Sequence, residues 1–154
     1  MPHHRVEIDE AEALDLHFWV QRFDHLTGGR RLGLEPWYLD GVVPLDATEA
    51  DREALATAVY EIMCELVPAD DFTHYADVQH EYARFYPHRT TGLTFDELFV
   101  EGETGSYVSP DRSWGIVSFG WTGPVVVVFF GEALLSRLRS RSPALLARLL
   151  PMEE

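Results

Sequence analysis

The densest group of side chains able to do chemistry lies in residues 74–81, His-Tyr-Ala-Asp-Val-Gln-His-Glu, and His88 follows closely. Imidazole and carboxylate groups are the side chains with which proteins bind zinc or transfer protons. The zinc motif H-E-x-x-H is absent from the sequence, as are the glycine motifs of nucleotide sites and of serine hydrolases. We therefore expect no metal, no cofactor and no catalytic residue of a known pattern.

The geometry of this group depends on the element that carries it. On a single strand, His74, His80 and His88 would share one face but spread over about 46 Å, too far for one metal ion. Asp77 and Glu81 would lie about 13 Å apart, too far for the paired carboxylates of a glycosidase. A single strand therefore predicts a half-buried histidine held by a carboxylate, beside a solvated acidic face.

A helix over residues 75–85 is the alternative. It would align a stripe of polar side chains and bring histidine and carboxylate groups together: Asp77, His80, Glu81 and Arg84. However, residues 76–82 alternate as strands do, and the segment is rich in aromatic residues and lacks a helix cap. These features favour a strand.

The first helix is predicted over residues 10–26, where apolar side chains recur at spacings of three and four. Asp9 is the expected cap, and Glu12 three residues later completes a box-like start. Residues 30–47 are expected to form a loop that contains a short extended piece at residues 37–39.

Further helices follow the same logic. One is predicted over residues 49–67, with Thr48 as its N-cap and a proline directly after its end. Another begins after Gly131, and a short terminal helix is expected over residues 143–150 with Ser142 as its cap.

Three strands are predicted at residues 105–108, 114–120 and 125–130, and short turns separate them. Loops this short require antiparallel neighbours, so these strands form a meander. The strand at 125–130 is apolar on both faces, which is typical of an internal strand covered by helices. We therefore predict an α+β fold in one domain, residues 1–154: an antiparallel sheet with helices packed mainly on one face.

Charge is strong and unevenly distributed. The net charge is −14; residues 1–103 hold 22 Asp and Glu against 7 Arg, a net charge of −15, whereas residues 104–154 hold 4 against 5, a net charge of +1. Such an acidic field repels nucleic acid and anionic membranes and attracts basic proteins. The same acidity also serves solubility.

Compartment and membrane association follow from cysteine usage and hydropathy. Cys64 is the single cysteine, which fits a reducing compartment. The first twenty residues are too acidic for a signal peptide, and the longest apolar run, residues 125–130, is far too short for a membrane span. We expect a soluble, cytoplasmic protein.

Two segments carry a resemblance. Residues 77–87, D-V-Q-H-E-x3-F-x-P, and the W-G-I…F-G-E-x-L-L close over residues 114–135 resemble the bacterial domain-of-unknown-function 2716 family, with matching order over residues 68–136. The family's G-H-P-W segment is replaced at residues 119–124 by a sequence without the histidine. The resemblance implies a small α+β fold with residues 79–81 on a strand, and it implies no activity.

The favoured hypothesis is an acidic protein-binding module, of immunity or inhibitor type, that neutralises a basic partner such as a toxin. Its expected binding residues are Asp70, Asp71, Asp77, Gln79, His80 and Glu81. One alternative is a small hydrolase or metal-dependent enzyme centred on His80 with Asp77 or Glu81. A second alternative is a homodimer that uses exposed aromatic residues such as Trp37, Tyr38 and Trp121.

Overall fold

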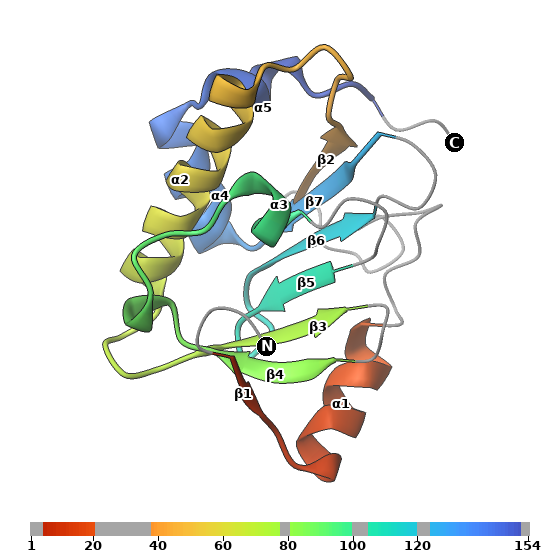
Figure 1. Ribbon diagram of the computed structural model, residues 1–154, viewed down its shortest axis with the longest axis vertical. Coiled ribbons are helices and arrows are strands. Elements are labelled where there is room, and N and C mark those ends of the chain that lie inside the picture. The colour runs from red at the N-terminus through yellow and green to blue at the C-terminus, as the bar shows by residue number, and fades with distance from the viewer. Residues whose placement is uncertain (1–4, 21–37, 78–80, 100–104, 120–123, 152–154) are drawn as a thin grey trace.

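The computed structural model describes residues 5–20, 38–77, 81–99, 105–119 and 124–151. Within these residues one seven-stranded antiparallel sheet has the strand order β1-β4-β3-β5-β6-β7-β2 (Figure 1). Its strands are β1 Arg5–Glu7, β2 Tyr38–Val42, β3 Thr73–Asp77, β4 Tyr82–Phe85, β5 Gly105–Val108, β6 Gly115–Phe119 and β7 Val126–Phe130.

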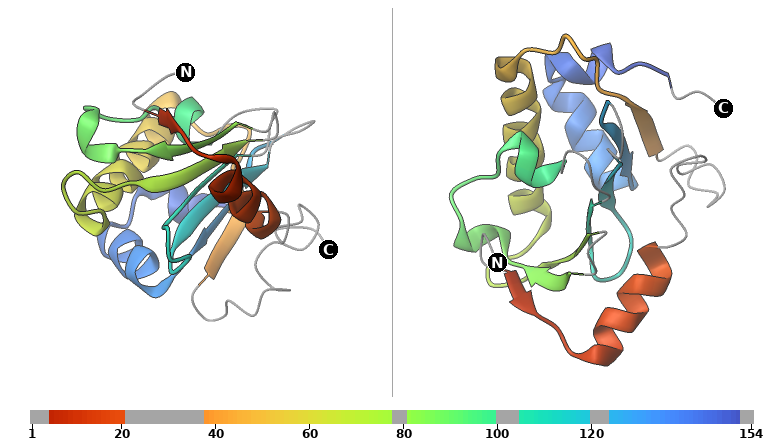
Figure 2. Two further views of the ribbon diagram at one scale, coloured as in Figure 1. Left: turned by 90° about the horizontal axis from the view of Figure 1, so that it is seen from below. Right: turned by 45° about the vertical axis from the view of Figure 1, so that its right-hand side comes forward.

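The helices divide unequally between the two faces of the sheet. Four helices, which we name the α2 group, pack on one face: α2 Glu49–Leu66, α3 Phe95–Leu98, α4 Glu132–Arg141 and α5 Ala144–Arg148. The helix α1, Glu10–Val20, lies against the other face near β3 and β4, away from the α2 group (Figure 2). The predicted α+β fold, with helices mainly on one face, is confirmed.

The alternation of side chains along the strands builds two cores. Tyr75, Tyr107 and Phe129 point toward α2 and its neighbours and are almost fully buried there. Their chain neighbours, including Val108 and Phe130, point to the α1 side, where Leu16 of α1 is fully buried against them. Adjacent residues of a strand therefore serve different cores, as a strand period of two requires.

The predicted meander is confirmed, since β5, β6 and β7 are successive antiparallel neighbours. The strand β7 lies between β6 and β2, and this internal position explains why it is apolar on both faces. The extended piece predicted at residues 37–39 is confirmed at Tyr38 and Leu39, which belong to β2; the strand continues to Val42, so the loop prediction is wrong at residues 40–42. Pairing with β7 provides hydrogen-bond partners for the backbone of β2.

Two helix starts follow the predicted caps. The Asp9 carboxylate accepts the Glu12 N–H at 2.8 Å at the start of α1, and the Thr48 hydroxyl accepts the Asp51 N–H at 3.1 Å at the start of α2. The structure describes α1 up to Val20, and the rest of the predicted helix lies outside the described residues.

Two predictions at chain reversals are wrong. Residues 75–85 do not form one strand: β3 and β4 are separate and pair with each other antiparallel. Ser142 does not cap the last helix; it ends α4 in the left-handed conformation with φ of 46°, and Pro143 is the N-cap of α5. The strand β1 and the short helix α3 were not predicted, although Thr94 and Glu97 form a capping box at the start of α3.

Leu150 pairs with the strand β2. Val42 and Leu150 exchange two backbone hydrogen bonds, each of 2.8 Å, so the end of the chain pairs with the outer edge of this strand. Gly41 permits the approach, because a Cβ there would lie 2.7 Å from the Leu149 Cβ. In the parts of the chain that the structure describes, no helix is long and apolar enough to cross a membrane.

Candidate functional site

The hairpin of β3 and β4 brings two of the predicted binding residues together. The Glu81 N–H donates to the Asp77 carboxylate at 3.1 Å, and the Asp77 N–H donates to the Glu81 carbonyl at 3.1 Å. The Tyr75 hydroxyl donates to the other Asp77 oxygen at 3.2 Å. The separation of about 13 Å expected from a single strand is therefore wrong, because the chain reverses between the two residues. Gln79 and His80, between them, lie outside the described residues.

The other predicted binding residues lie elsewhere. Asp70, with φ of 66°, and Asp71 form the exposed turn between α2 and β3. Six residues of extended chain, about 20 Å, separate Asp71 from Asp77 at the far end of β3. The four described members of the predicted set therefore do not converge on one site.

His88 also lies apart from His74. It belongs to the 3-10 helix Pro87–Arg89 and donates from Nε2 to the Val67 carbonyl at 2.5 Å. His74 and His88 therefore do not share one strand face, because His88 follows the end of β4 and lies in the 3-10 helix. The hydrolase alternative centres on His80, outside the described residues, and stays a prediction.

A second polar cluster, which we name the α1 clamp, fastens α1 to the sheet. Its members come from α1, β3, β4 and the β5–β6 turn: Glu12, Asp15, His74, Arg84 and Arg112. Glu12 accepts two hydrogen bonds from Arg84, at 2.9 and 3.0 Å, and one from His74 at 2.6 Å. Asp15 accepts one from Arg112 at 3.1 Å. Two consecutive turns of α1 are thus tied to the sheet.

The hydrogen bonds define the protonation of His74. Arg112 donates to His74 Nδ1 at 2.7 Å, so Nδ1 must keep its lone pair and the ring proton sits on Nε2, facing Glu12. Burial lowers the pKa of His74, and the nearby Arg112 charge lowers it further, although the Glu12 contact acts in the opposite direction. The neutral imidazole is therefore the form that this cluster stabilises.

The remaining members are held by charge and packing. The Arg84 hydrogen bonds lower the pKa of the Glu12 carboxyl, and the Arg84 guanidinium also stacks over the Phe72 ring at 4.3 Å. Burial lowers the pKa of Arg112, which adopts a left-handed backbone with φ of 64°. For a residue with a Cβ that conformation costs about 1–2 kcal/mol, which the Arg112 contacts must offset.

The α1 clamp is suited to positioning rather than to catalysis. Both ring nitrogens of His74 are engaged, so neither is available as a base or as a metal ligand. Among the residues that the structure describes, no three His, Cys, Asp or Glu side chains converge as a metal site would require.

The opposite side of the molecule uses arginine differently. Arg141 of α4 pairs with Glu61 at 2.6 Å and with Glu65 of α2, and Arg148 of α5 pairs with Asp46 at 3.1 Å. These pairs lie in the solvent-facing rim between helices. They neutralise much of the acidity that α2 would otherwise present.

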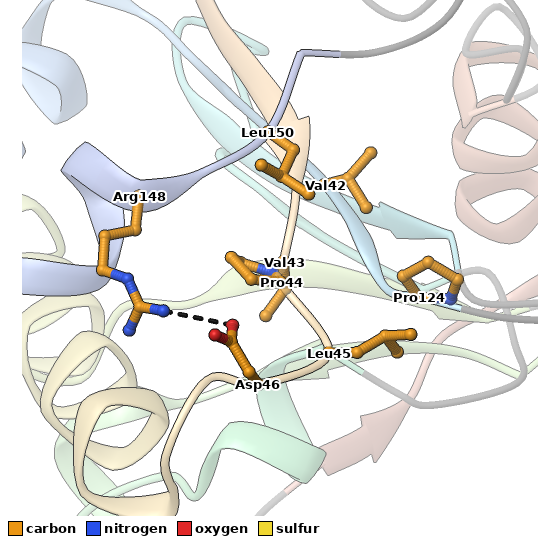
Figure 3. Close-up of a pocket in the computed structure, with 8 residues that line it drawn as sticks. All are labelled: Val42, Val43, Pro44, Leu45, Asp46, Pro124, Arg148 and Leu150. Atoms are coloured by element: carbon orange, nitrogen blue, oxygen red, sulfur yellow. Dashed lines mark hydrogen bonds and ion pairs between the residues drawn. The ribbon is translucent and has the colours of Figure 1, made fainter.

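An open hollow of about 620 Å³ lies at the β2 edge of the sheet (Figure 3). Most of its lining is apolar, and the Asp46–Arg148 ion pair provides its charged groups. The residues that line it are Val42, Val43, Pro44, Leu45, Asp46, Pro124, Arg148 and Leu150. Tyr38, which was expected to be exposed for dimerisation, is half-buried in the α1-side core; Trp37 and Trp121 lie outside the described residues.

Sequence reasoning missed Arg84 as the partner of Glu12 and Arg112 as the partner of His74. Their contacts join residues 38 to 97 positions apart, and no local motif records such pairings. One signal was present: Glu12 follows the α1 cap by three residues, which places it in the first turn of the helix.

No family model, no curated protein and no solved structure matches this chain. The resemblance to the domain-of-unknown-function 2716 family therefore stays a prediction from the quoted segments.

Proposed function

We propose that the protein is an acidic binding module, of inhibitor or immunity type, that holds a cationic partner protein. One observation carries the proposal: in the N-terminal segment, residues 5–20, Arg84 and Arg112 pair with Glu12 and Asp15 but leave the other carboxylates outside the ion pairs of the described residues. Residues 5–20 contain five carboxylates against one arginine. Glu7, Asp9 and Glu10 are exposed to solvent in this segment.

The contrast with α2 strengthens the proposal. Glu61 and Glu65 of α2 lie within ion-pair distance of Arg141, whereas Glu7 and Glu10 have no arginine within that distance in the described parts of the chain. An unneutralised acidic surface raises the association rate of cationic partners and makes the rate dependent on salt. The same field disfavours nucleic acid and anionic membranes.

A toxin is the partner suggested by analogy, since small acidic domains often serve as immunity proteins. The α1 clamp supports a binding role as well. Its titratable groups are engaged in hydrogen bonds that hold α1 in position.

Affinity capture from the native host tests the proposal. The immobilised full chain should retain one or a few basic proteins at about 0.05 M salt and release them by about 0.5 M salt, as identified by mass spectrometry. An unrelated acidic protein of similar net charge is the control for nonspecific retention. A chain that retains nothing beyond this control at low salt would contradict the proposal.

A further inference from the structure

The helix α1 is apolar on two sides. Leu16 is fully buried against the sheet, and the Trp19 ring packs near Phe130 with 5.6 Å between ring centroids. On the opposite side Leu14 is 51 % exposed and Phe18 is 62 % exposed. Residues four apart on a helix are neighbours, so these two side chains form one patch, which exposed Ala11 extends by one turn. We name this patch the α1 stripe: Ala11, Leu14 and Phe18.

The α1 clamp fixes the direction in which the α1 stripe points. Glu12 pairs with Arg84 of β4, and Asp15 pairs with Arg112 of the β5–β6 turn. Leu16, on the same side of the helix, is fully buried in the core. Because these contacts hold one side of α1, the helix cannot rotate to bury Leu14 and Phe18. The stripe is therefore a rigid surface that is formed before any partner arrives.

Carboxylates lie on both sides of the α1 stripe. At 100° per residue, Glu10 falls on one flank of Leu14 and Phe18, and Asp15 falls on the other. The Asp15 side chain is 80 % exposed, so it can accept a second cation while it keeps its contact with Arg112. Glu7 adds an exposed negative charge just before the helix.

We propose that the α1 stripe is the docking surface for a cationic amphipathic segment of a partner protein. This inference rests on the proposed function and names its surface and the chemistry of its partner. The apolar side of that segment covers Leu14 and Phe18, and its Lys or Arg side chains pair with Glu10 and Asp15. A guanidinium would also stack favourably on the exposed Phe18 ring.

Charge selects this occupant over two others. A second copy of the chain, itself at −14, would bring like charges together around the stripe. An anionic bilayer would be repelled by Glu7, Glu10 and Asp15 in the same way. A basic amphipathic helix or strand satisfies both the apolar centre and the acidic flanks of the stripe.

The first test uses a fluorescein-labelled synthetic helix built from leucine and lysine with amphipathic spacing, and a scrambled peptide of equal composition. Anisotropy should show that the full chain binds the amphipathic peptide more tightly. Phe18→Ser should raise Kd at least about tenfold, the range expected for an aromatic anchor. Leu45→Ser is the matched control, because Leu45 is 79 % exposed on the other side of the molecule, and it should leave Kd within about twofold.

The second arm tests the acidic flank. Glu10→Gln should weaken binding and reduce its salt dependence, whereas Glu49→Gln, an exposed acid in the first turn of α2, should change neither. Thermal unfolding establishes that each variant is folded. Because the substituted side chains are exposed, we expect the melting temperatures to stay near that of the wild type.

The outcomes separate the inference from the proposed function. If the peptide binds wild type and Phe18→Ser equally, the α1 stripe is not the surface, although binding of a cationic partner stands. If no basic peptide or captured protein binds at low salt, the proposed function fails. A dimer in light scattering that Phe18→Ser dissociates, or binding to phosphatidylserine vesicles that Phe18→Ser abolishes, would assign the stripe to another occupant and overturn the inference.

Discussion

Arg141 on α4 and Arg84 on β4 each bring a guanidinium to a glutamate, on opposite sides of one sheet. Around Arg141, the partners Glu61 and Glu65 are about half exposed, and water competes for every charge. Around Arg84, the partner Glu12 is 19 % exposed and also accepts a hydrogen bond from buried His74. The contacts are alike in chemistry and differ in what surrounds them.

This difference separates two ways of attaching a helix. The α2 group covers a broad apolar core, and its ion pairs lie at the solvent-exposed rim of that core. The single helix α1 covers a smaller core, so polar contacts must contribute more of its attachment. Partly buried ion pairs lose more when one partner is removed than exposed ones do, because the remaining charge is left poorly solvated.

The largest effect is expected in the core under the α2 group. Phe129→Ala should lower the free energy of unfolding by about 3–5 kcal/mol, because Phe129 is fully buried and its loss leaves a cavity beside Phe99. Urea unfolding followed by circular dichroism measures the change. Phe18→Ala, at an exposed position, is the control and should stay within about 0.5 kcal/mol. Equal losses in both variants would refute the assignment of the main core to this face.

The α1 clamp should rank second. Arg84→Met keeps an apolar stem over Phe72 but removes both hydrogen bonds to Glu12, and we expect a loss of about 2 kcal/mol. Hydrogen exchange should show that the loss is concentrated in faster opening of α1, with α2 little changed. A uniform increase of exchange across both helices would contradict the separate attachment of α1.

Acid should loosen the α1 side first. Burial holds the pKa of His74 below its ordinary value near 6.5, so the unfolded chain takes up this proton at a higher pH than the folded chain does. The stability contributed by neutral His74 is therefore complete above about pH 6.5 and declines as the pH falls toward the folded-state pKa. The lowered pKa of Glu12 acts in the same direction below its ordinary value of 4.5.

Urea unfolding at several pH values between about 7.5 and 5.5 measures this slope. His74→Gln should flatten the slope. The interpretation is wrong if the slope survives in His74→Gln. We expect the loss of stability on protonation of His74 to be smaller than the loss in Arg84→Met, because Glu12 still pairs with Arg84 and with the protonated His74.

The smallest effect is expected at the rim. Glu61→Gln should change the free energy of unfolding by no more than about 0.5 kcal/mol, since exposed ion pairs contribute little and Arg141 keeps its contact with Glu65. Differential scanning calorimetry at low and high salt is the measurement. A loss as large as that of Arg84→Met would remove the distinction between the two regions.

Much of this fold could be predicted because its signals are local. The caps at Asp9 and Thr48 and the short turns between β5, β6 and β7 are each determined within a few residues. The reversal between Asp77 and Glu81 was missed because the strand-like alternation of side chains continues through residues 76–82, so the sequence predicts one longer strand. The α1 clamp could not be predicted, since it forms only when the β5–β6 turn reaches the helix and brings Arg112 to His74.

The pairing of Val42 with Leu150 bears on how the sheet ends. An edge strand exposes unpaired N–H and C=O groups that can recruit a strand from another molecule. Here Leu150 occupies part of the β2 edge, and the opposite edge strand, β1, spans three of the described residues. Leu150 thus covers part of the β2 edge, and we expect removal of this pairing to expose backbone groups that can recruit a strand from another molecule.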